Sequence, residues 1–322
     1  MRFPTKVFLI LLWTLNVYAL KAETFPSKPI RWVVTSPAGD GGDVTGRLIA
    51  DKLSKVLSQP ITIDNKPGAG GVIGSEIVAK ATPDGYTMVV GNAGSHSITP
   101  ELYKNLNYDP VNDFTAVGLF CTAPNVMVVN PNLHLHSVTE FINFAKKQGQ
   151  SLNYGSGGIG SSAHMSGELF KSMTGVQMLH VPYKGTVPAA TALASGEVDV
   201  LIANLPGILT EFIKAGRVQA LAVSSKKRVG SFPDLPTLEE TIPDFETVAW
   251  FGLFAPASTP KDIIAKINVL INQALGTEDI KRQFASIGCQ PEPGTATDFA
   301  NRVNKDVTRW KKLALDNNIK AN

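Results

Sequence analysis

Cysteine is scarce in this chain of 322 residues, in which only Cys121 and Cys289 occur. Two cysteines are too few for the disulfide framework that stabilises small secreted domains. The sequence leaves a single bridge between them open. Both have apolar or small neighbours, however, and we favour two separate, mostly buried thiols.

Patterns typical of metal sites and of serine hydrolases are also missing. His134 and His136 are two positions apart without further clustered ligands, so we expect solvated histidines and no metal. No G-x-S-x-G segment occurs that could form the nucleophile elbow of an α/β hydrolase. We therefore expect a protein that is not an enzyme, and an exported hydrolase is a minor alternative.

Long apolar runs are absent except near the N-terminus. Arg2 and Lys6 precede the apolar run Val7–Leu15, which is shorter than the roughly 20 residues that a membrane span needs. This pattern predicts a signal peptide over residues 1–22, cleaved before Glu23, and a periplasmic mature protein. An uncleaved anchor is the alternative, and without a cysteine at the cleavage point we expect no membrane anchor after cleavage.

An excess of charge is also absent from the predicted mature chain. The 30 Lys and Arg and 27 Asp and Glu give a formal charge of +3, but three of the cations, Arg2, Lys6 and Lys21, belong to the signal peptide. The remaining charges balance, and we expect no nucleic-acid partner. About 300 residues remain, enough for two domains of ordinary size.

What the chain does have is a regular alternation of strand and helix patterns. Strands such as Ile30–Thr35 and Val198–Ala203 alternate with helical apolar spacing, which predicts an α/β fold with parallel sheets covered on both faces. We predict two lobes, residues 23–117 plus 225–322 and residues 118–224. The apolar stretch Val117–Val129 is the expected crossing strand, and Val218–Val223 the expected return.

Glycine-rich loops lie between a strand and a helix at two places. Tyr154–His164 combines glycines with Ser161 and Ser162, which can cap the following helix and leave N–H groups for an anion. Ser36–Asp43 repeats this design. Further polar loops follow strands around Gly91, Lys184 and Asn204, and ligands in α/β folds bind at such strand ends.

The first of these loops also has the spacing of a dinucleotide-binding fingerprint. Gly155, Gly157 and Gly160 spell G-x-G-x-x-G. The next strand ends at Met178–His180 without the acid that holds a ribose, and an exported enzyme would lack a supply of cytoplasmic cofactor. We therefore expect no cofactor.

Several passages together resemble the Bug-type, or tripartite tricarboxylate transporter, family of periplasmic solute-binding proteins. The resemblance covers the predicted mature chain in order, and its passages are Pro26–Ile30, Gly39–Asp43 with Arg47, Asn65–Gly71, Pro83–Tyr86, Tyr154–His164, Val181–Gly185, Gly196 with Asp199, and Trp250–Leu253.

This resemblance implies a two-lobed periplasmic-binding-protein fold, type II-like, with the ligand in the inter-lobe cleft. The implied function is capture of a small carboxylate (an amino acid or a mono- or dicarboxylate) and delivery to membrane transporter subunits. In such proteins the loops matching Ser36–Asp43 and Gly155–Ser162 hold the carboxylate through backbone N–H groups and waters. Binding for a signalling partner is the alternative role, and we expect a monomer.

The predicted ligand-binding residues come from these loops and from the other strand ends. Asp43 is also a candidate for orienting its loop, Arg47 for an ion pair and His164 for packing. The predicted residues are Ser36, Pro37, Ala38, Gly39, Asp40, Gly41, Asp43, Gly91, His96, Ser156, Gly157, Gly158, Gly160, Ser161, Ser162, Tyr183, Lys184 and Asn204.

Asp40 departs from the family pattern, because it stands within what is usually a run of glycines. If its carboxylate faces the cleft, it disfavours multiply charged anions, and we expect an amino acid or a monocarboxylate in preference to citrate. The alternative is that Asp40 points to solvent.

Overall fold

The computed structural model describes residues 25–103, 106–148, 152–205, 207–230 and 232–320. The predicted signal peptide, residues 1–22, lies outside the described residues. None of the described helices is both long enough and apolar enough to cross a bilayer.

The first sheet, sheet A, has six strands in the order β11-β4-β10-β3-β1-β2. β1 pairs in parallel with β2 and β3, whereas β10 pairs antiparallel with β3 and β4. The strands are β1 (Ile30–Val34), β2 (Ile61–Asn65), β3 (Thr87–Asn92), β4 (Phe114–Pro124), β10 (Val248–Pro256) and β11 (Gln290–Pro291). The helices of this part are α1 (Gly41–Leu57), α2 (Val72–Ala79), α3 (Thr99–Leu102), α8 (Lys261–Leu275), α9 (Glu278–Ser286) and α10 (Ala296–Asp316).

The second sheet, sheet B, has five strands in the order β7-β6-β8-β5-β9. β6 is parallel to β7 and β8, and β5 is antiparallel to β8 and β9. The strands are β5 (Val126–Val129), β6 (Asn153–Ser156), β7 (Leu179–Pro182), β8 (Val200–Ala203) and β9 (Gln219–Val223). The helices are α4 (Val138–Gln148), α5 (Ser162–Thr174), α6 (Thr186–Ser195) and α7 (Gly207–Lys214).

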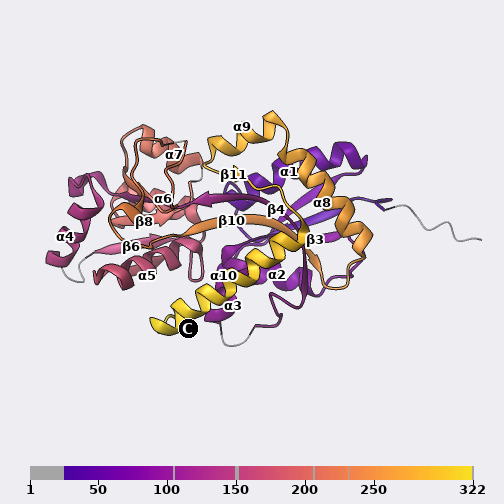
Figure 1. Ribbon diagram of the computed structural model, residues 1–322, viewed down its shortest axis with the longest axis horizontal. Coiled ribbons are helices and arrows are strands. Elements are labelled where there is room, and N and C mark those ends of the chain that lie inside the picture. Colours follow the sequence, from indigo (N-terminus) through magenta and orange to yellow (C-terminus); the bar gives the residue numbers. More distant parts are fainter. Residues whose placement is uncertain (1–24, 104–105, 149–151, 206, 231, 321–322) are drawn as a thin grey trace, which may run out of the picture.

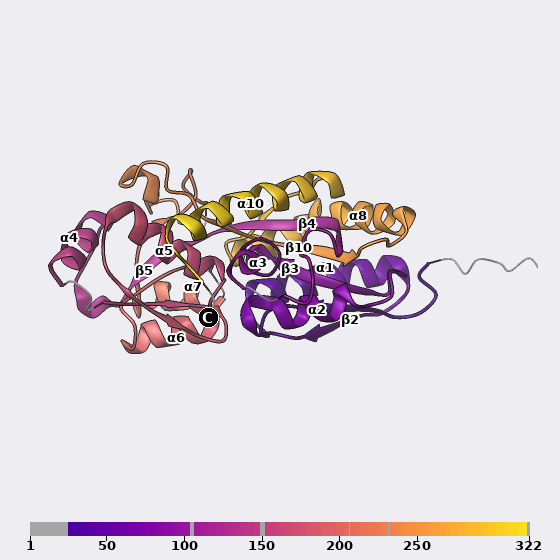
Figure 2. The same ribbon diagram turned by 90° about the horizontal axis from the view of Figure 1, so that it is seen from below.

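The two sheets lie at opposite ends of the long axis, and β4 and β10 run along the middle of the molecule (Figure 1). From below, α10 follows β4 along much of its length (Figure 2). The predicted α/β, two-lobed fold is confirmed. The expectation of purely parallel sheets is wrong, because the strands that link the two halves enter each sheet antiparallel to their neighbours.

The change from one sheet to the other occurs later in the chain than predicted. β4 stays in sheet A to Pro124, and sheet B begins at Val126, so the crossing point is Asn125. Ser224, which follows β9, pairs with Asn125. Its hydroxyl accepts the Asn125 N–H at 2.8 Å, and the Ser224 N–H donates to the Asn125 carbonyl at 2.8 Å.

The expected return strand also differs from the structure. β9, which matches the predicted Val218–Val223 segment, belongs to sheet B, and the chain rejoins sheet A only at Val248. Between them, Leu238, Ile242 and Phe245 pack in the core of sheet B, although their residues were assigned to the other lobe. An apolar side chain is drawn to whichever core is nearest, and sequence alone did not identify that core.

Both cysteines are free and buried, as favoured from the sequence. Cys121 on β4 and Cys289 before β11 belong to the same apolar cluster of sheet A, together with Trp32 and Phe120. Burial raises the pKa of the Cys121 thiol.

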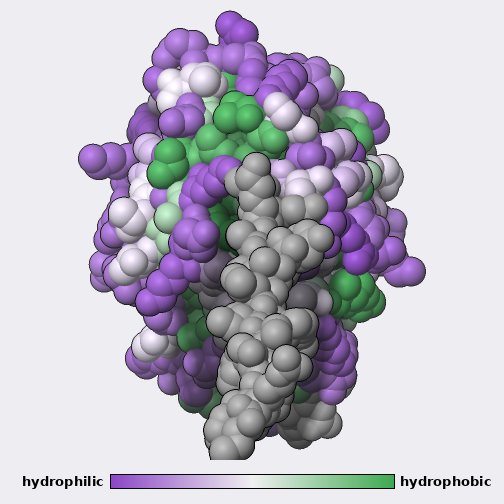
Figure 3. Space-filling view, turned by 90° about the vertical axis from the view of Figure 1, so that its right-hand side faces the viewer, coloured by the Kyte–Doolittle hydropathy of each residue, from purple (hydrophilic) through white to green (hydrophobic). Residues whose placement is uncertain are grey.

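The surface at the α1 and α8 end is mainly hydrophilic, with smaller hydrophobic areas between (Figure 3). The exposed large apolar side chains Val56, Leu179, Val269 and Leu315 come from four different elements. The monomer expected from the sequence stays a prediction.

Candidate functional site

A cavity of about 690 Å³ lies between the two lobes and is lined by loops from both. Both lobes contribute strand-end loops, in agreement with the rule that ligands bind at such ends. Of the predicted site residues, the cavity is lined by Ser36, Pro37, Asp40, Gly41, Gly157, Gly158, Ser161, Ser162, Tyr183, Lys184 and Asn204.

The lobes touch on either side of this cavity, so the structure is a closed form. On one side, a Cβ at Gly185 would lie 2.8 Å from both Asp40 Oδ2 and Pro37 Cγ of the other lobe. On the other side, a Cβ at Gly94 would lie 3.1 Å from the carbonyl oxygen of Gly160. The glycines at these contacts allow the backbones of the two lobes to approach closely.

The start of α1 is open towards the cavity. Asp40 is its N-cap residue, yet the Asp40 side chain makes no hydrogen bond to its own helix. Gly41 and Gly42, the first helical residues, line the cavity, and no side chain caps this helix start. Such a helix start carries unsatisfied donors and a partial positive charge, which together favour an anion.

Two neighbours press against these glycines and shape the opening. A Cβ at Gly41 would lie 2.5 Å from the Phe251 ring, and one at Gly42 would lie 2.8 Å from Ser36 Oγ. Glycine is therefore required for this packing. The Ser36 hydroxyl oxygen is buried and has no hydrogen-bond partner among the described residues. An unpartnered polar group is costly, and a ligand that supplies the missing bond is favoured.

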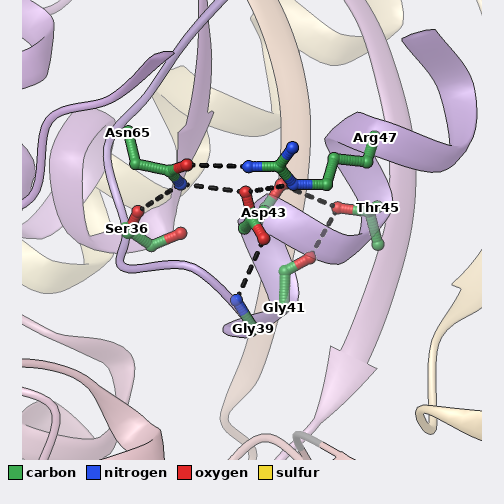
Figure 4. A network of polar contacts seen from close by, with 8 residues as sticks. Ser36, Gly39, Gly41, Asp43, Thr45, Arg47 and Asn65 are labelled. Carbon is green, nitrogen blue, oxygen red and sulfur yellow. Dashed lines mark hydrogen bonds and ion pairs between the residues drawn. The ribbon is translucent and has the colours of Figure 1, made fainter. Parts of the chain in front are cut away.

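Asp43 fixes the loop before α1 through hydrogen bonds and an ion pair, as Figure 4 shows. Its Oδ2 accepts the Gly39 N–H at 2.9 Å, and its Oδ1 accepts from Asn65 Nδ2 at 2.9 Å and pairs with Arg47 Nε at 2.8 Å. Asn65 Nδ2 also donates to the Ser36 carbonyl at 3.0 Å, and its Oδ1 accepts from Arg47. Asp43 is buried and does not line the cavity, so it orients the loop, and the ion pair expected for Arg47 is confirmed.

The side chain of Asp40, in lobe 1, forms hydrogen bonds with lobe 2. Its Oδ2 accepts the Thr186 N–H at 3.2 Å and its Oδ1 accepts the Val187 N–H at 3.3 Å, so it caps α6 in the other lobe. It is only 6% exposed, and the expectation that it points to solvent is wrong. Burial raises the pKa of the Asp40 carboxyl to about 6, against the effect of the two N–H groups and with a contribution from Asp43.

The glycine loop of lobe 2 leads from β6 to α5. Ser161 is the N-cap of α5, and its hydroxyl accepts the His164 N–H at 3.2 Å, as the sequence predicted. Ser156 closes the other end of the loop, where its hydroxyl accepts the Gly158 N–H at 3.1 Å. Gly157, Gly158, Ser161 and Ser162 line the cavity from this side.

Two stacked histidines support this loop on the side away from the cavity. The His164 and His180 rings lie 4.2 Å apart, and His180 in turn stacks on Tyr154. His164 Nδ1 accepts the Gly160 N–H at 3.3 Å, and His180 Nε2 lies 2.6 Å from Ser156 Oγ. Burial lowers the pKa of His164 to about 4 and of His180 to about 3, so both rings are neutral near pH 7. The packing role expected for His164 fits this arrangement.

The remaining wall combines strand ends of lobe 2 with one aromatic residue of lobe 1. The Tyr183 hydroxyl donates to Glu197 Oε1 at 2.7 Å, and Lys184 is exposed at the same strand end. Asn204 faces the start of α1, because a Cβ at Gly41 would lie 3.1 Å from its Nδ2. Phe251 on β10 lines the cavity, whereas its neighbour Trp250 is buried in the core.

Several predicted site residues do not line the cavity. His96 is fully buried, stacks 4.1 Å from Phe254 and has a pKa lowered to about 3 by burial. Gly91 lies directly under this ring, with a hypothetical Cβ 2.5 Å away. Both predictions are wrong. The segment that follows β3 directs the His96 ring into the apolar core, where it covers Gly91, and not towards the cavity. The others off the cavity are Ala38, Gly39, Asp43, Ser156 and Gly160, which belong to the two loops but face away from the space.

Sequence reasoning missed part of lobe 1's contribution. The turn Pro67–Gly71, the segment Asn92–Gly94 and Phe251 line the cavity from lobe 1, and Thr186 is a further lining residue from lobe 2. The glycines of the turn after Asn65 are a signal that could have identified it. This turn follows β2, an edge strand of sheet A, and it was not among the predicted site residues.

The chain matches the family model described as "Tripartite tricarboxylate transporter family receptor" over residues 45–319. It belongs to this family. The Protein BugT of Bordetella pertussis strain Tohama I is 33% identical over 303 residues, covering 94% of this chain and 93% of that protein. The family and its structural neighbours are periplasmic solute-binding proteins and not enzymes.

Two solved structures that are similar to this chain were determined with carboxylates. A protein of R. palustris solved with adipate is 36% identical, with a TM-score of 0.88, covering 92% of this chain and 99% of that one. MatC from Rhodopseudomonas palustris with bound malate is 33% identical, with a TM-score of 0.83, covering 90% and 99% of the two chains.

Proposed function

We propose that this receptor captures a small carboxylate between its two lobes and delivers it to a tripartite-type membrane transporter. The observation that carries the proposal is the uncapped start of α1, which faces a closed cavity next to the unpartnered hydroxyl of Ser36. A carboxylate accepts hydrogen bonds from both kinds of donor and gains from the helix dipole.

The number of available donors fits ordinary receptor affinity. Charge-assisted hydrogen bonds contribute about 1.5–3 kcal/mol each. Two to four of them, less the cost of ordering the ligand and closing the lobes, reach the roughly −8 kcal/mol of micromolar binding.

The relatives support the class of ligand. The R. palustris protein was solved with adipate and MatC with malate, and both are small carboxylates. The proposal includes export by a signal peptide over residues 1–22 and action as a monomer. It divides the chain into two lobes, with one junction near Asn125 and the other shortly before Val248.

Thermal unfolding of the purified protein with a panel of carboxylates tests this function. A ligand that binds only the folded state raises its stability by about 2.7 kcal/mol at 100 times its dissociation constant. We expect at least one of hexanoate, glutamate, malate, adipate and citrate to raise the midpoint, while hexanol, which lacks the carboxylate, leaves it unchanged. Equal midpoints with every carboxylate and with hexanol would rule the proposal out.

A further inference from the structure

The described helix starts that border the cavity include those of α1, α2, α5 and α6, and they differ in what occupies them. Gly41 and Gly42 of α1 and Ser162 of α5 line the space, and α1 has no side-chain cap. The first N–H groups of α6 are occupied, because Thr186 and Val187 donate to Asp40. The chain therefore places a carboxylate of its own at one of these positive ends, the start of α6.

The position of Asp40 is unusual for an N-cap acid. An aspartate at the start of a helix ordinarily accepts from its own second or third N–H group. Here the side chain turns away from α1, which leaves α1 open and closes α6. One residue thus decides which of two neighbouring helix starts remains available to a ligand.

Little positive charge is present to offset this carboxylate. Among the described residues that line the cavity, Lys184 alone carries a positive charge, and it is exposed. α6 contains no charged residue, and β10 faces the cavity with Ala249 and Phe251. The nearest other charge on α1 is Asp43, whose own cation, Arg47, is already paired with it.

Resting on the proposed function, we propose that Asp40 is the specificity-determining residue that excludes ligands with a second carboxylate. The ligand carboxylate binds at the start of α1. Its other end extends into a space bordered by Asp40 and by apolar side chains such as Phe251, Ile159 and Ile73. The site therefore takes monocarboxylates whose distal end is neutral or cationic.

The physical reason is that Asp40 acts against a second anion in two ways. It uses the two α6 donors that a second carboxylate could have accepted from. Asp40 also repels that carboxylate, and because Asp40 is buried, this repulsion is less screened than between charges in bulk water. A distal methyl group avoids both penalties, and a distal ammonium group is attracted.

Titration calorimetry at pH 7.5 with hexanoate, 6-aminohexanoate and adipate tests the inference. These ligands have the same number of carbons and differ at the distal end. The proteins are the wild type, Asp40→Asn, Asp40→Gly and the control Asp51→Asn, an acid on the same helix whose side chain is 59% exposed. Thermal midpoints verify that each variant is folded, and Asp40→Asn carries the test if the glycine variant is not.

We expect the wild type and Asp51→Asn to bind hexanoate at least tenfold more tightly than adipate, with 6-aminohexanoate no weaker than hexanoate. In Asp40→Asn this preference for hexanoate falls at least tenfold. If hexanoate binds but adipate binds the wild type equally well, or if the preference is unchanged in the Asp40 variants, the inference is wrong and the proposed function stands. If no carboxylate binds the wild type, both fail.

Discussion

The N–H group of Thr186, in one lobe, donates to the carboxylate of Asp40, in the other, at 3.2 Å. This bond joins the starts of α1 and α6 across the cavity. Asp40 is a buried acid that lines the cavity, so its protonation state affects both the stability of the protein and the electrostatic field that a ligand meets.

The first prediction concerns the pH dependence of stability. Burial raises the Asp40 pKa from 3.8 to about 6, so its stabilising contribution is fully present below pH 3.8 and is lost as the pH rises through 6. Relative to Asp40→Asn, the wild type should lose on the order of 2–3 kcal/mol between pH 4 and pH 7.5. Thermal unfolding of ligand-free protein across this range measures the difference, which should shift midpoints by several degrees.

The exposed acid Asp51 provides the control for that titration. Asp51→Asn should follow the wild-type pH profile, since its side chain is 59% exposed. Parallel profiles of the wild type and Asp40→Asn would show that the Asp40 pKa is not raised in the folded protein.

The second prediction concerns Asp43. Asp43→Ala removes the acceptor of the Gly39 N–H and of Asn65, which together hold the loop before α1. We expect carboxylate affinity to fall at least tenfold and stability to fall by about 1–3 kcal/mol, because buried donors lose their partner. Calorimetry and thermal unfolding, compared with Asp51→Ala, measure the two effects. An unchanged affinity would mean that the network does not position the site.

The third prediction concerns Ser36, whose hydroxyl has no partner in the described protein. Ser36→Ala removes a buried polar group that is unsatisfied without ligand, so the ligand-free protein should be equally stable or more stable by up to about 1 kcal/mol. Carboxylate affinity should fall by roughly three- to tenfold, since a net bond of about 0.5–1.5 kcal/mol is lost. If Ser36→Ala loses stability but keeps its carboxylate affinity, the hydroxyl stabilises the fold and does not bind the ligand.

The fourth prediction separates two buried histidines. His164→Phe keeps the ring stack on His180 but removes the acceptor of the Gly160 N–H, and it should weaken carboxylate binding several-fold. His96→Phe should change stability alone, because His96 lies in the core beside Phe254. The carboxylate dissociation constants and thermal midpoints of both variants measure these effects. Weakened carboxylate binding in His96→Phe would contradict the assignment of His96 to the core alone.

What the sequence predicted well depends on neighbours along the chain. The N-cap role of Ser161 and the ion pair expected for Arg47, whose partner is Asp43, involve residues three or four positions apart, which lie close together on a helix. The alternation of strands and helices likewise led to the α/β fold.

What it could not supply are the partners that only folding brings together. Thr186 is 146 positions from Asp40, and no local pattern told whether Asp40 faces solvent, the cleft or another helix. His96 follows a strand like a site residue, but its ring turns towards Phe254. Phe251 belongs to an apolar strand segment, where aromatic residues usually pack in the core, and only the fold places it against the start of α1 at the cavity.

A structure of the protein with a bound monocarboxylate tests the central claim most directly. The account predicts the ligand carboxylate at the start of α1, held by the N–H groups of Gly41 and Gly42 and by Ser36 Oγ, directly or through one water. A carboxylate bound elsewhere, or one in this cavity that points away from α1, would contradict it.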